Sequence, residues 1–230
     1  MKKIILTAIA VIAMITCIAQ KPEYAGWTES DMKKANTAVN TSLSQEEKNV
    51  FLYTNLSRLN GKLFGDTYLK AYLEKNDCDD ENIESLYEDL SKIKDLPMLY
   101  PAAGLCNAAK AHVDDQGPTG AIGHNSSDGT SFGNRVHSYF NCNGIAENAS
   151  YGTYTGKDIV MVLLLDEGVP SLGHRKNILN GSYHSLGTSI GNHSAYGTMC
   201  VMDFAYCEAG AGNFSYDDNT NNNDNKGGNE

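Results

Sequence analysis

Apolar residues recur at helical spacing in the first half of the chain. Ser44 and Glu47 match a capping box, in which each side chain bonds the backbone N–H of the other residue. The apolar positions that follow repeat every three or four residues until Asn60 and Gly61 interrupt them, so we predict an amphipathic helix over 44–60. Three further helices are predicted at residues 67–73, 80–94 and 101–113, the last beginning with a proline in its first turn.

The pattern changes after this helical part. Residues 116–148 are rich in Gly, Asn, Ser and Asp, which predicts a loop of unusual length for a compact domain. The apolar run at 157–165 is typical of a buried helix, and the positions at 186–190 and 198–206 predict two strands. Helices that flank late strands indicate a fold of the α/β class.

The first residues are typical of an export signal. Two lysines precede an apolar run over 4–13, which predicts a secretory signal peptide over 1–19. The run is shorter than the roughly 20 residues that span a bilayer, so we favour cleavage and a secreted or periplasmic protein over a membrane anchor. Lipidation of Cys17 is an alternative, although Thr16 is a poor match to the small residue that precedes such sites.

We predict one domain, at 44–208. Residues 20–43 are polar with a lone Trp27, and we interpret them as a lead-in segment, either a tether or a short helix. Residues 209–230 form an Asn/Asp/Gly-rich tract that is too poor in apolar residues to order itself, so we predict a disordered tail. No stretch after the signal peptide is long and apolar enough to span a membrane.

Charge and cysteine content narrow the function further. The 230 residues include 28 Asp and Glu against 18 Lys and Arg, a net charge of −10, and no basic cluster lies beyond the N-terminus. Nucleic-acid binding is therefore not expected. Cleavage after residue 19 would leave an odd number of cysteines, so at least one thiol is free or pairs with another molecule. Spacing does not select a pairing among Cys78, Cys106, Cys142, Cys200 and Cys207.

Two histidines and a carboxylate stand out in Gly/Asn-rich segments. His124 and His174 each follow a glycine, and Glu147 lies between them in the sequence. Two neutral imidazoles with one carboxylate can hold a zinc-like cation and leave a position open for water. The separations of the three residues fit no local metal motif, so their convergence in space is a hypothesis.

These residues belong to an ordered series of motifs. The chain contains, in this order, the segments NLSR (55–58), GHNSSDG (123–129), AEN (146–148), LDEGVP (165–170) and GHRKNIL (173–179), together with Arg135. The series resembles a bacterial SCP-like domain of the CAP superfamily, which comprises cysteine-rich secretory proteins, antigen 5 and pathogenesis-related proteins. The resemblance runs from about Ser44 to about Cys207. It implies secretion, a three-layer α/β/α sandwich, and a surface cleft lined by two histidines and two acidic residues.

The resemblance also implies roles for individual residues. His124 looks like the first cleft histidine and His174 like the second, and both are candidate ligands of zinc or another divalent cation. Glu147 looks like the carboxylate of the family's Gly-Glu-Asn motif, in which Ala replaces Gly here. Either Asp166 or Glu167 could be the fourth cleft residue, and we favour Glu167.

Three functions follow from this interpretation. The leading hypothesis is a secreted module whose cleft binds a divalent cation and an extracellular ligand, which would be a peptide, a glycan or a lipid. The alternative is a metal-dependent extracellular hydrolase in which Glu147 activates a bound water. A third is a structural or adhesive protein that does not use the cleft. Fold alone does not choose among them.

Two other residues match motifs that we do not take as functional. Ser189 lies in a G-x-S-x-G sequence, but a nucleophile elbow needs a helix directly after the serine, and residues 192–197 predict a turn. His112 lies within a predicted helix, where a histidine satisfied by hydrogen bonds is the simpler interpretation.

Overall fold

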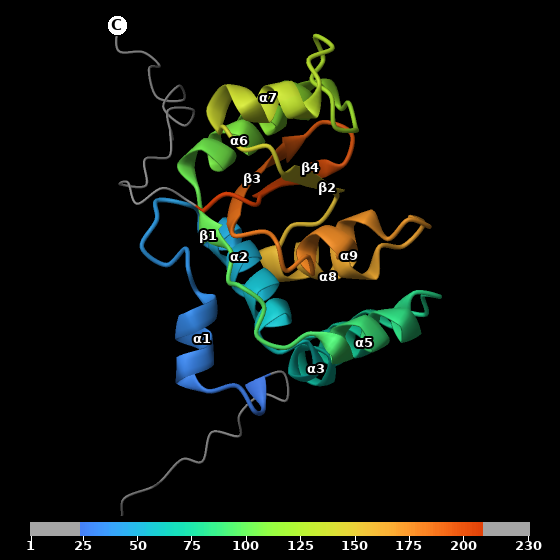
Figure 1. The fold of residues 1–230 in the computed structure, drawn as a ribbon. Coiled ribbons are helices and arrows are strands. Elements are labelled where there is room, and N and C mark those ends of the chain that lie inside the picture. Colours follow the sequence, from blue (N-terminus) through green and yellow to red (C-terminus); the bar gives the residue numbers. More distant parts are fainter. Residues whose placement is uncertain (1–23, 209–230) are drawn as a thin grey trace, which may run out of the picture.

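The computed structural model describes residues 24–208, and Figure 1 shows them in three layers, with a sheet between two sets of helices. This arrangement confirms the predicted α/β/α sandwich. The predicted signal peptide 1–19, with Cys17, and the predicted tail 209–230 lie outside the described residues. Within 24–208, no helix has the length and apolar content that a membrane crossing requires.

The central layer is a four-stranded sheet in the order β1-β3-β4-β2. β2 and β3 both pair antiparallel with β4, and the short β1 runs parallel to β3. β2 is therefore an edge strand of this sheet. The strands are β1 (Tyr100–Pro101), β2 (Ile145–Tyr151), β3 (Ser185–His193) and β4 (Gly197–Ala205).

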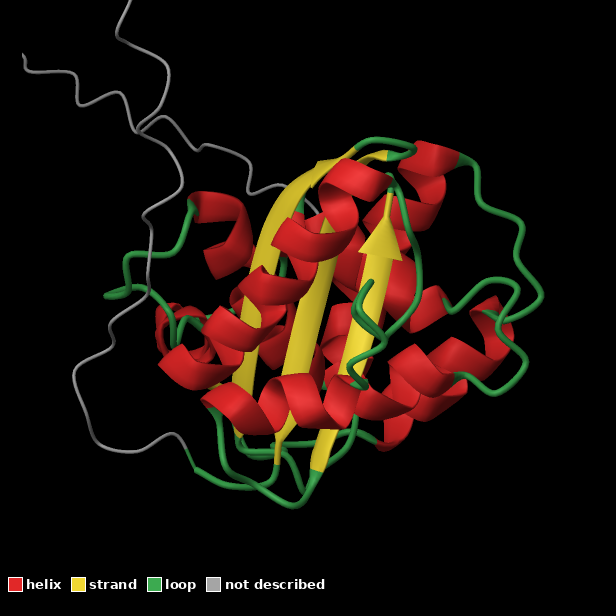
Figure 2. Ribbon diagram, turned by 90° about the horizontal axis from the view of Figure 1, so that it is seen from above, coloured by secondary structure: helices red, strands yellow, loops and turns green. Residues whose placement is uncertain are grey.

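Helices cover both faces of the sheet (Figure 2). Side chains of α6 and α7 pack on one face, against Val201 and Ala205, whereas α2 and α8 pack on the other, against Met202 and Phe204. Alternate residues of β4 thus serve opposite faces. The helical elements are α1 (Glu29–Ala35), α2 (Gln45–Leu59), α3 (Gly61–Phe64), the π-helical η2 (Gly65–Leu69), α4 (Lys70–Asn76), α5 (Ile83–Lys92), α6 (Ala103–Thr119), α7 (Phe132–Tyr139), α8 (Gly156–Leu165) and α9 (Gly173–Ile178).

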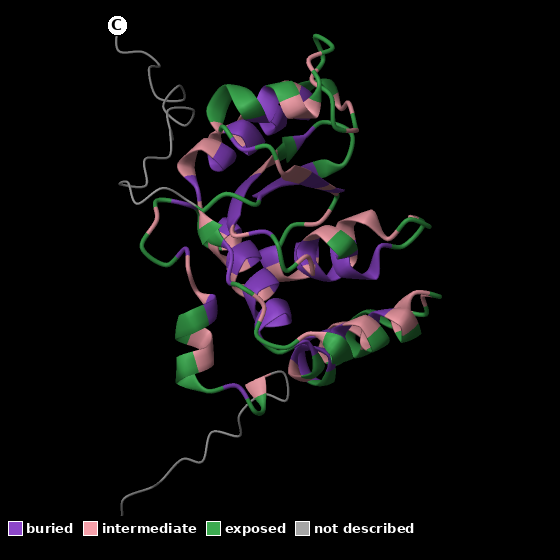
Figure 3. Cartoon of the chain, in the orientation of Figure 1, coloured by how far each residue is buried: buried purple, intermediate pink, exposed green. Residues whose placement is uncertain are grey.

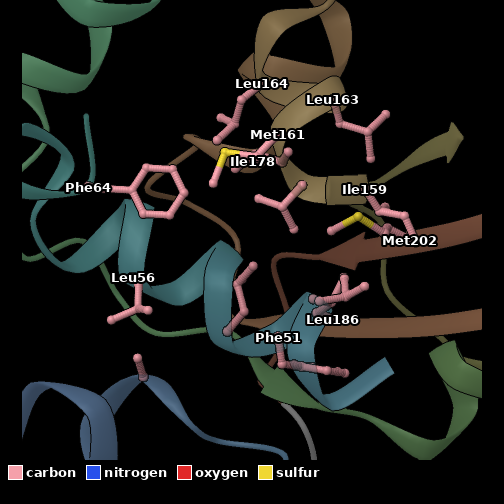
Figure 4. Close-up of a cluster of buried hydrophobic side chains, with 14 of the residues drawn as sticks. Phe51, Leu56, Phe64, Ile159, Met161, Leu163, Leu164, Ile178, Leu186 and Met202 are labelled. Atoms are coloured by element: carbon pink, nitrogen blue, oxygen red, sulfur yellow. The ribbon is translucent and has the colours of Figure 1, made fainter. Parts of the chain in front are cut away.

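The larger core fills the space between the sheet and the α2/α8 layer. Figure 4 shows Phe51 and Leu56 of α2 in one cluster with Ile159 of α8, Leu186 of β3 and Met202 of β4. All five side chains are fully buried. The strands and the inner sides of the helices are buried together in Figure 3, so apolar burial holds the layers in contact.

The α6 layer approaches β3 closely because Gly187 has no side chain. A Cβ at this position would lie 2.1 Å from the backbone carbon of Leu105, closer than real contacts allow. Asp203 of β4 is the register partner of Gly187, and Glu147 of β2 is the register partner of Asp203. Directly opposed residues point to the same face, so both carboxyl side chains lie on the α6 face.

Several predicted elements are confirmed. The Ser44 side chain accepts a hydrogen bond from the Glu47 N–H and the Glu47 side chain bonds back, so the predicted capping box opens α2. Asn60 is the C-cap of that helix. The buried helix predicted from residue 157 is α8. The predicted strand 186–190 lies within β3, and the predicted strand 198–206 matches β4 except for its last residue.

Two predictions around α6 are wrong. Pro101 does not open a helix: it belongs to β1, which pairs with β3, and the helix begins two residues later. The predicted loop 116–148 contains the end of α6, all of α7 and the start of β2. The Ser131 side chain caps α7, and pairing with β4 orders the polar β2. The composition of residues 116–148 is typical of a loop, but pairing with a distant strand orders part of this segment, and composition does not encode that pairing.

The described part of the lead-in segment packs on the domain and is not a tether. It contains the short helix α1, and Trp27 in front of it is buried. The indole Nε1 of Trp27 donates to Thr67 Oγ1 at 3.0 Å. Residues 24–43 therefore belong to the same packed unit as the helices that follow.

One disulfide joins Cys142, just before β2, to Cys207, just after β4. Cys78 is a partly exposed free thiol, and Cys106 and Cys200 are buried free thiols. Burial raises the pKa of each buried thiol to about 12, so neither forms a thiolate at neutral pH. The structure thus selects one pairing that the spacing had left open.

Arg58, the last residue of the NLSR motif, connects α2 by hydrogen bonds to the chain around the end of α9. Its guanidinium donates to the carbonyl oxygens of Pro97, Ile178, Asn180 and Tyr183 at 2.8–3.1 Å. Burial lowers the pKa of this arginine to about 10, which leaves it charged at neutral pH. The C-terminal end of α9 is therefore fixed by a buried cation on backbone oxygens.

Candidate functional site

His124 lies in the loop after α6 and pairs with Glu147 on β2. Nδ1 of His124 and Oε1 of Glu147 are 2.8 Å apart. The Glu147 side chain is 1% exposed and the His124 side chain 51%. A carboxylate can only accept, so the proton of this hydrogen bond is on Nδ1 and the Nε2 edge is directed away from the pair.

The backbone of the His124 loop is held from several elements. Gly123 takes a positive φ of 110°, its N–H donates to the Tyr151 hydroxyl at 3.0 Å, and its carbonyl oxygen lies 2.8 Å from His112 Nε2. Burial lowers the pKa of His112, so its neutral ring donates from Nε2 to that carbonyl. His112 is thus a buried, hydrogen-bonded helical residue that supports the loop. Arg135 Nη1 donates to the His124 carbonyl oxygen at 2.8 Å.

Arg135 also pairs with Glu147 directly. Its Nη2 donates to Oε2 of Glu147, while Oε1 faces His124. The Arg135 side chain is 4% exposed, so this is a buried ion pair. Both oxygens of Glu147 are therefore occupied by donors from two different elements.

Asp203 adds a second buried carboxyl group next to Glu147. It is fully buried, and no donor among the described residues reaches either of its oxygens. A hydrogen bond between it and the Glu147 carboxylate requires a proton on one of the two groups. Burial, with the charge of Glu147 beside it, raises the pKa of Asp203 well above its ordinary value, although Arg135 opposes this rise. The surroundings of Asp203 therefore favour its neutral, protonated form.

The pairing changes the protonation of His124. The hydrogen bond to Glu147 raises the pKa of His124 above 6.5, and partial burial opposes this rise. A raised native pKa means that the pair stabilises the fold below pH 6.5, and that this stabilisation is lost as the pH rises through the native value. His124 therefore stays protonated to a higher pH than an isolated histidine does.

His174, at the start of α9, pairs with Asp166 at the end of α8. Nδ1 of His174 lies 2.6 Å from Asp166 Oδ1. The other oxygen, Oδ2, accepts the backbone N–H groups of His174 at 2.9 Å and Arg175 at 3.1 Å. Asp166 has a left-handed backbone with φ 59°, as the C-cap of α8. The His174 side chain is 24% exposed and that of Asp166 is fully buried.

The structure corrects the preferred fourth residue of the cleft. Glu167 is exposed, and the carboxylate that bonds His174 is that of Asp166. Asp166 takes the position against that histidine because the helix ends there and turns its carboxylate back to the start of α9. The sequence placed both acids side by side and could not show at which residue α8 ends.

β2 connects the two pairs. Glu147 points to the α6 face, whereas its neighbour Asn148 points to the α8 and α9 side, where its Nδ2 donates to the His174 carbonyl oxygen at 3.0 Å. Asn177 of α9 donates to Asn148 Oδ1 at 2.8 Å and to the Glu147 carbonyl oxygen at 3.4 Å. The two histidine–carboxylate pairs therefore flank one edge strand, one on each face of the sheet.

The residues present do not form a complete metal site. Within 24–208, no group of three or more His, Cys, Asp and Glu side chains is arranged to hold a metal ion. Zinc sites commonly use three or four protein ligands. His124 and His174 could each offer Nε2, so a cation would need further ligands from water or from a bound molecule. Their role as metal ligands stays a prediction.

Sequence reasoning missed two side chains of the site. Arg135 was present in the motif series without a role, and Asp203 was not singled out, although an acid inside the apolar run of a buried strand is a signal. The doubt about Ser189 is confirmed, because β3 leads into β4 and no helix follows the serine.

Comparison with known proteins identifies a family and two similar solved structures. Residues 89–223, more than half of the chain, match the family model described as the cysteine-rich secretory protein family, CAP. An extracellular protein containing an SCP domain from Bacillus anthracis str. Ames is similar in structure at 18% identity, with a TM-score of 0.45; the match covers 79% of this chain and 44% of that one. An outer surface protein from Borrelia burgdorferi has 18% identity and a TM-score of 0.39, over 59% of this chain and 84% of that one. No curated protein matches. The chain belongs to the cysteine-rich secretory protein (CAP) family.

Proposed function

We propose that this protein is an extracellular binding module whose ligand lies in the cleft along β2, between the His124–Glu147 and His174–Asp166 pairs. The location outside the cytoplasm rests on the predicted signal peptide over 1–19. The ligand would be a peptide, a glycan or a lipid, held by the two imidazoles together with a divalent cation such as zinc.

The orientation of the two imidazoles supports this proposal. In each pair Nδ1 is engaged by a buried carboxylate, at 2.8 Å for His124 and 2.6 Å for His174. A carboxylate on one ring nitrogen fixes the tautomer and makes the other nitrogen a better ligand or hydrogen-bond partner. Both Nε2 atoms are thereby oriented to bind a cation or a ligand.

A cation in this cleft would be shared with the ligand. His124 and His174 would hold it through Nε2, and the described residues provide no third ligand. The bound cation would attract an anionic or carbonyl oxygen of the ligand. We therefore expect metal affinity to be modest in the free protein and higher when a ligand completes the coordination.

The state of Glu147 favours a binding module over the hydrolase. A general base needs an oxygen within hydrogen-bond reach of the water that it activates. One oxygen of Glu147 is occupied by His124 and the other by Arg135, and the side chain is buried. Glu147 would have to release His124 or Arg135 before it could accept a proton from water.

Calorimetric titration with zinc tests the cation part of the proposal. We expect zinc binding by the wild type at pH 8 and a loss of about tenfold or more in His124→Ala and in His174→Ala. Affinity should fall as the pH drops below the raised pKa of His124, because the imidazolium has no free lone pair. His184→Ala, a partly exposed histidine outside both pairs, is the control. Equal zinc uptake by all four proteins would show that the paired histidines do not bind the cation.

A further inference from the structure

The backbone of β2 presents an outward row of polar groups. The Gly144 carbonyl oxygen accepts from Tyr206 N–H, and the Gly152 N–H donates to the Thr198 carbonyl oxygen, both at 2.9 Å. In an antiparallel ladder, every second residue bonds the neighbouring strand and the residues between them direct N–H and C=O away from it. Even-numbered residues of β2 therefore bond β4, and Ile145, Glu147, Ala149 and Tyr151 direct their backbone polar groups outward.

Most of these outward groups have no partner in the described chain. Asn177 Nδ2 donates to the Glu147 carbonyl oxygen at a long 3.4 Å. No other hydrogen bond from residues 24–208 reaches the outward N–H and C=O groups of this row. Ile145, Ala149 and Tyr151 are all partly exposed. The edge can thus accept a further strand around Ala149, next to the Asn177 contact.

The edge lacks several of the features that commonly prevent strand addition. Natural edge strands are protected by Lys, Pro, bulges or short length. β2 has seven residues, contains neither Lys nor Pro, and pairs with β4 without a bulge over its whole length. Its one acidic side chain, Glu147, points inward, which can itself protect an edge, but Arg135 balances its charge.

We propose that β2 binds an extended peptide as an additional strand of the sheet, with Ala149 at the centre of the contact. This inference rests on the proposed function and specifies its ligand: main-chain groups of the peptide bond β2, while peptide side chains on alternate faces meet His124 on one side and His174 on the other. Backbone donors and acceptors of β2 repeat about every 7 Å, the two-residue repeat of a strand. A polypeptide matches that repeat along its length, whereas a glycan or a lipid chain does not.

The test begins with a random linear 12-residue phage-displayed library on immobilised chain 20–230, with and without zinc. Selected peptides are then synthesised with one backbone N-methyl group at each position in turn. We expect alternation: methylation at every second residue lowers affinity tenfold or more, and methylation at the residues between has little effect. No enriched peptide, or no alternation along the peptide, overturns the proposal.

A variant of the protein tests the same contact from the other side. Ala149→Pro removes one outward N–H, a substitution that an edge strand accepts, and Ala149→Ser keeps the N–H at similar size. We expect the Pro variant to lose peptide binding and the Ser variant to keep it, with zinc titration unchanged in both. Equal peptide binding by both variants, or displacement of the peptide by glycans or lipid vesicles but not by a second peptide, overturns strand addition. Loss of zinc binding in the histidine variants is separate and decides the proposed cation site.

Discussion

The two histidine–carboxylate pairs have similar geometry, but different kinds of group hold the two carboxylates. Glu147 is surrounded by charged or titratable side chains: Arg135 and His124 bond it, and the Asp203 carboxyl group lies beside it. Asp166 is held by two backbone N–H groups at the start of α9 in addition to His174. The first pair is a cluster of titratable groups, and the second is a carboxylate fixed by the chain itself.

This difference affects how each pair responds to change. Backbone N–H groups neither titrate nor move without the helix, so the Asp166 pair depends mainly on geometry. The Glu147 cluster depends on a balance of charges inside a buried space, where losing one member leaves another uncompensated. A mutation or a pH change should therefore disturb the His124 side of the cleft more than the His174 side.

The largest contrast is expected in stability. Glu147→Ala leaves the buried Arg135 without its carboxylate and should lower the free energy of unfolding by about 3 kcal/mol, the lower end for a broken buried ion pair, because Asp203 can ionise in compensation. Asp166→Asn keeps an oxygen for the backbone N–H groups and a side chain suited to the left-handed backbone, so about 1 kcal/mol is expected. Urea denaturation at pH 7 measures both. An equal or larger loss in Asp166→Asn would contradict the comparison.

A second effect, smaller per pH unit but cumulative, should come from Asp203. Its raised pKa means that the native protein holds a proton that the unfolded chain releases above about pH 4, so wild-type stability falls with rising pH in that range. Relative to wild type, Asp203→Asn should gain about 1.4 kcal/mol per pH unit from pH 4 up to the native pKa.

Unfolding free energies at several pH values measure this gain. Asp79→Asn, an exposed acid, is the control and should run parallel to wild type. Parallel profiles for Asp203→Asn and wild type would mean that Asp203 is ionised in the native state.

The smallest predicted effect is a shift in the titration of His124. Glu147→Gln removes the charge that favours the imidazolium, so the pKa of His124 should fall toward 6.5. Asp166→Asn should leave the titration of His124 unchanged. NMR titration of the His124 ring protons separates the two outcomes, and an equal shift in both variants would show that the pairs are electrostatically coupled.

The sequence predicted the helices and late strands because its periodic segments are strong, whereas the layered arrangement was implied by the resemblance to the CAP superfamily. The capping box of Ser44 and Glu47 and the apolar run from residue 157 each encode a helix locally. The motif series also indicated the two histidines and Glu147. These elements need little information from distant parts of the chain.

The remaining features depend on contacts between distant residues. The polar β2 becomes a strand only by pairing with β4, more than 40 residues later. The proton on Asp203 depends on its register with Glu147, and the choice of Asp166 over Glu167 depends on the residue at which α8 ends. Neither composition nor spacing specifies such registers, which explains why the sequence indicated both histidines and Glu147 but not the contacts that hold them.

The hydrogen bonds of Arg58 to backbone carbonyl oxygens do not change between acidic and neutral pH. Its four carbonyl partners do not titrate, and its own pKa of about 10 keeps it charged across acidic and neutral conditions. The end of α9 should therefore keep its position when the surroundings acidify, whereas the loop of His124 gains charge. Acidification therefore adds charge beside Glu147 while the contacts that hold the end of α9 stay unchanged.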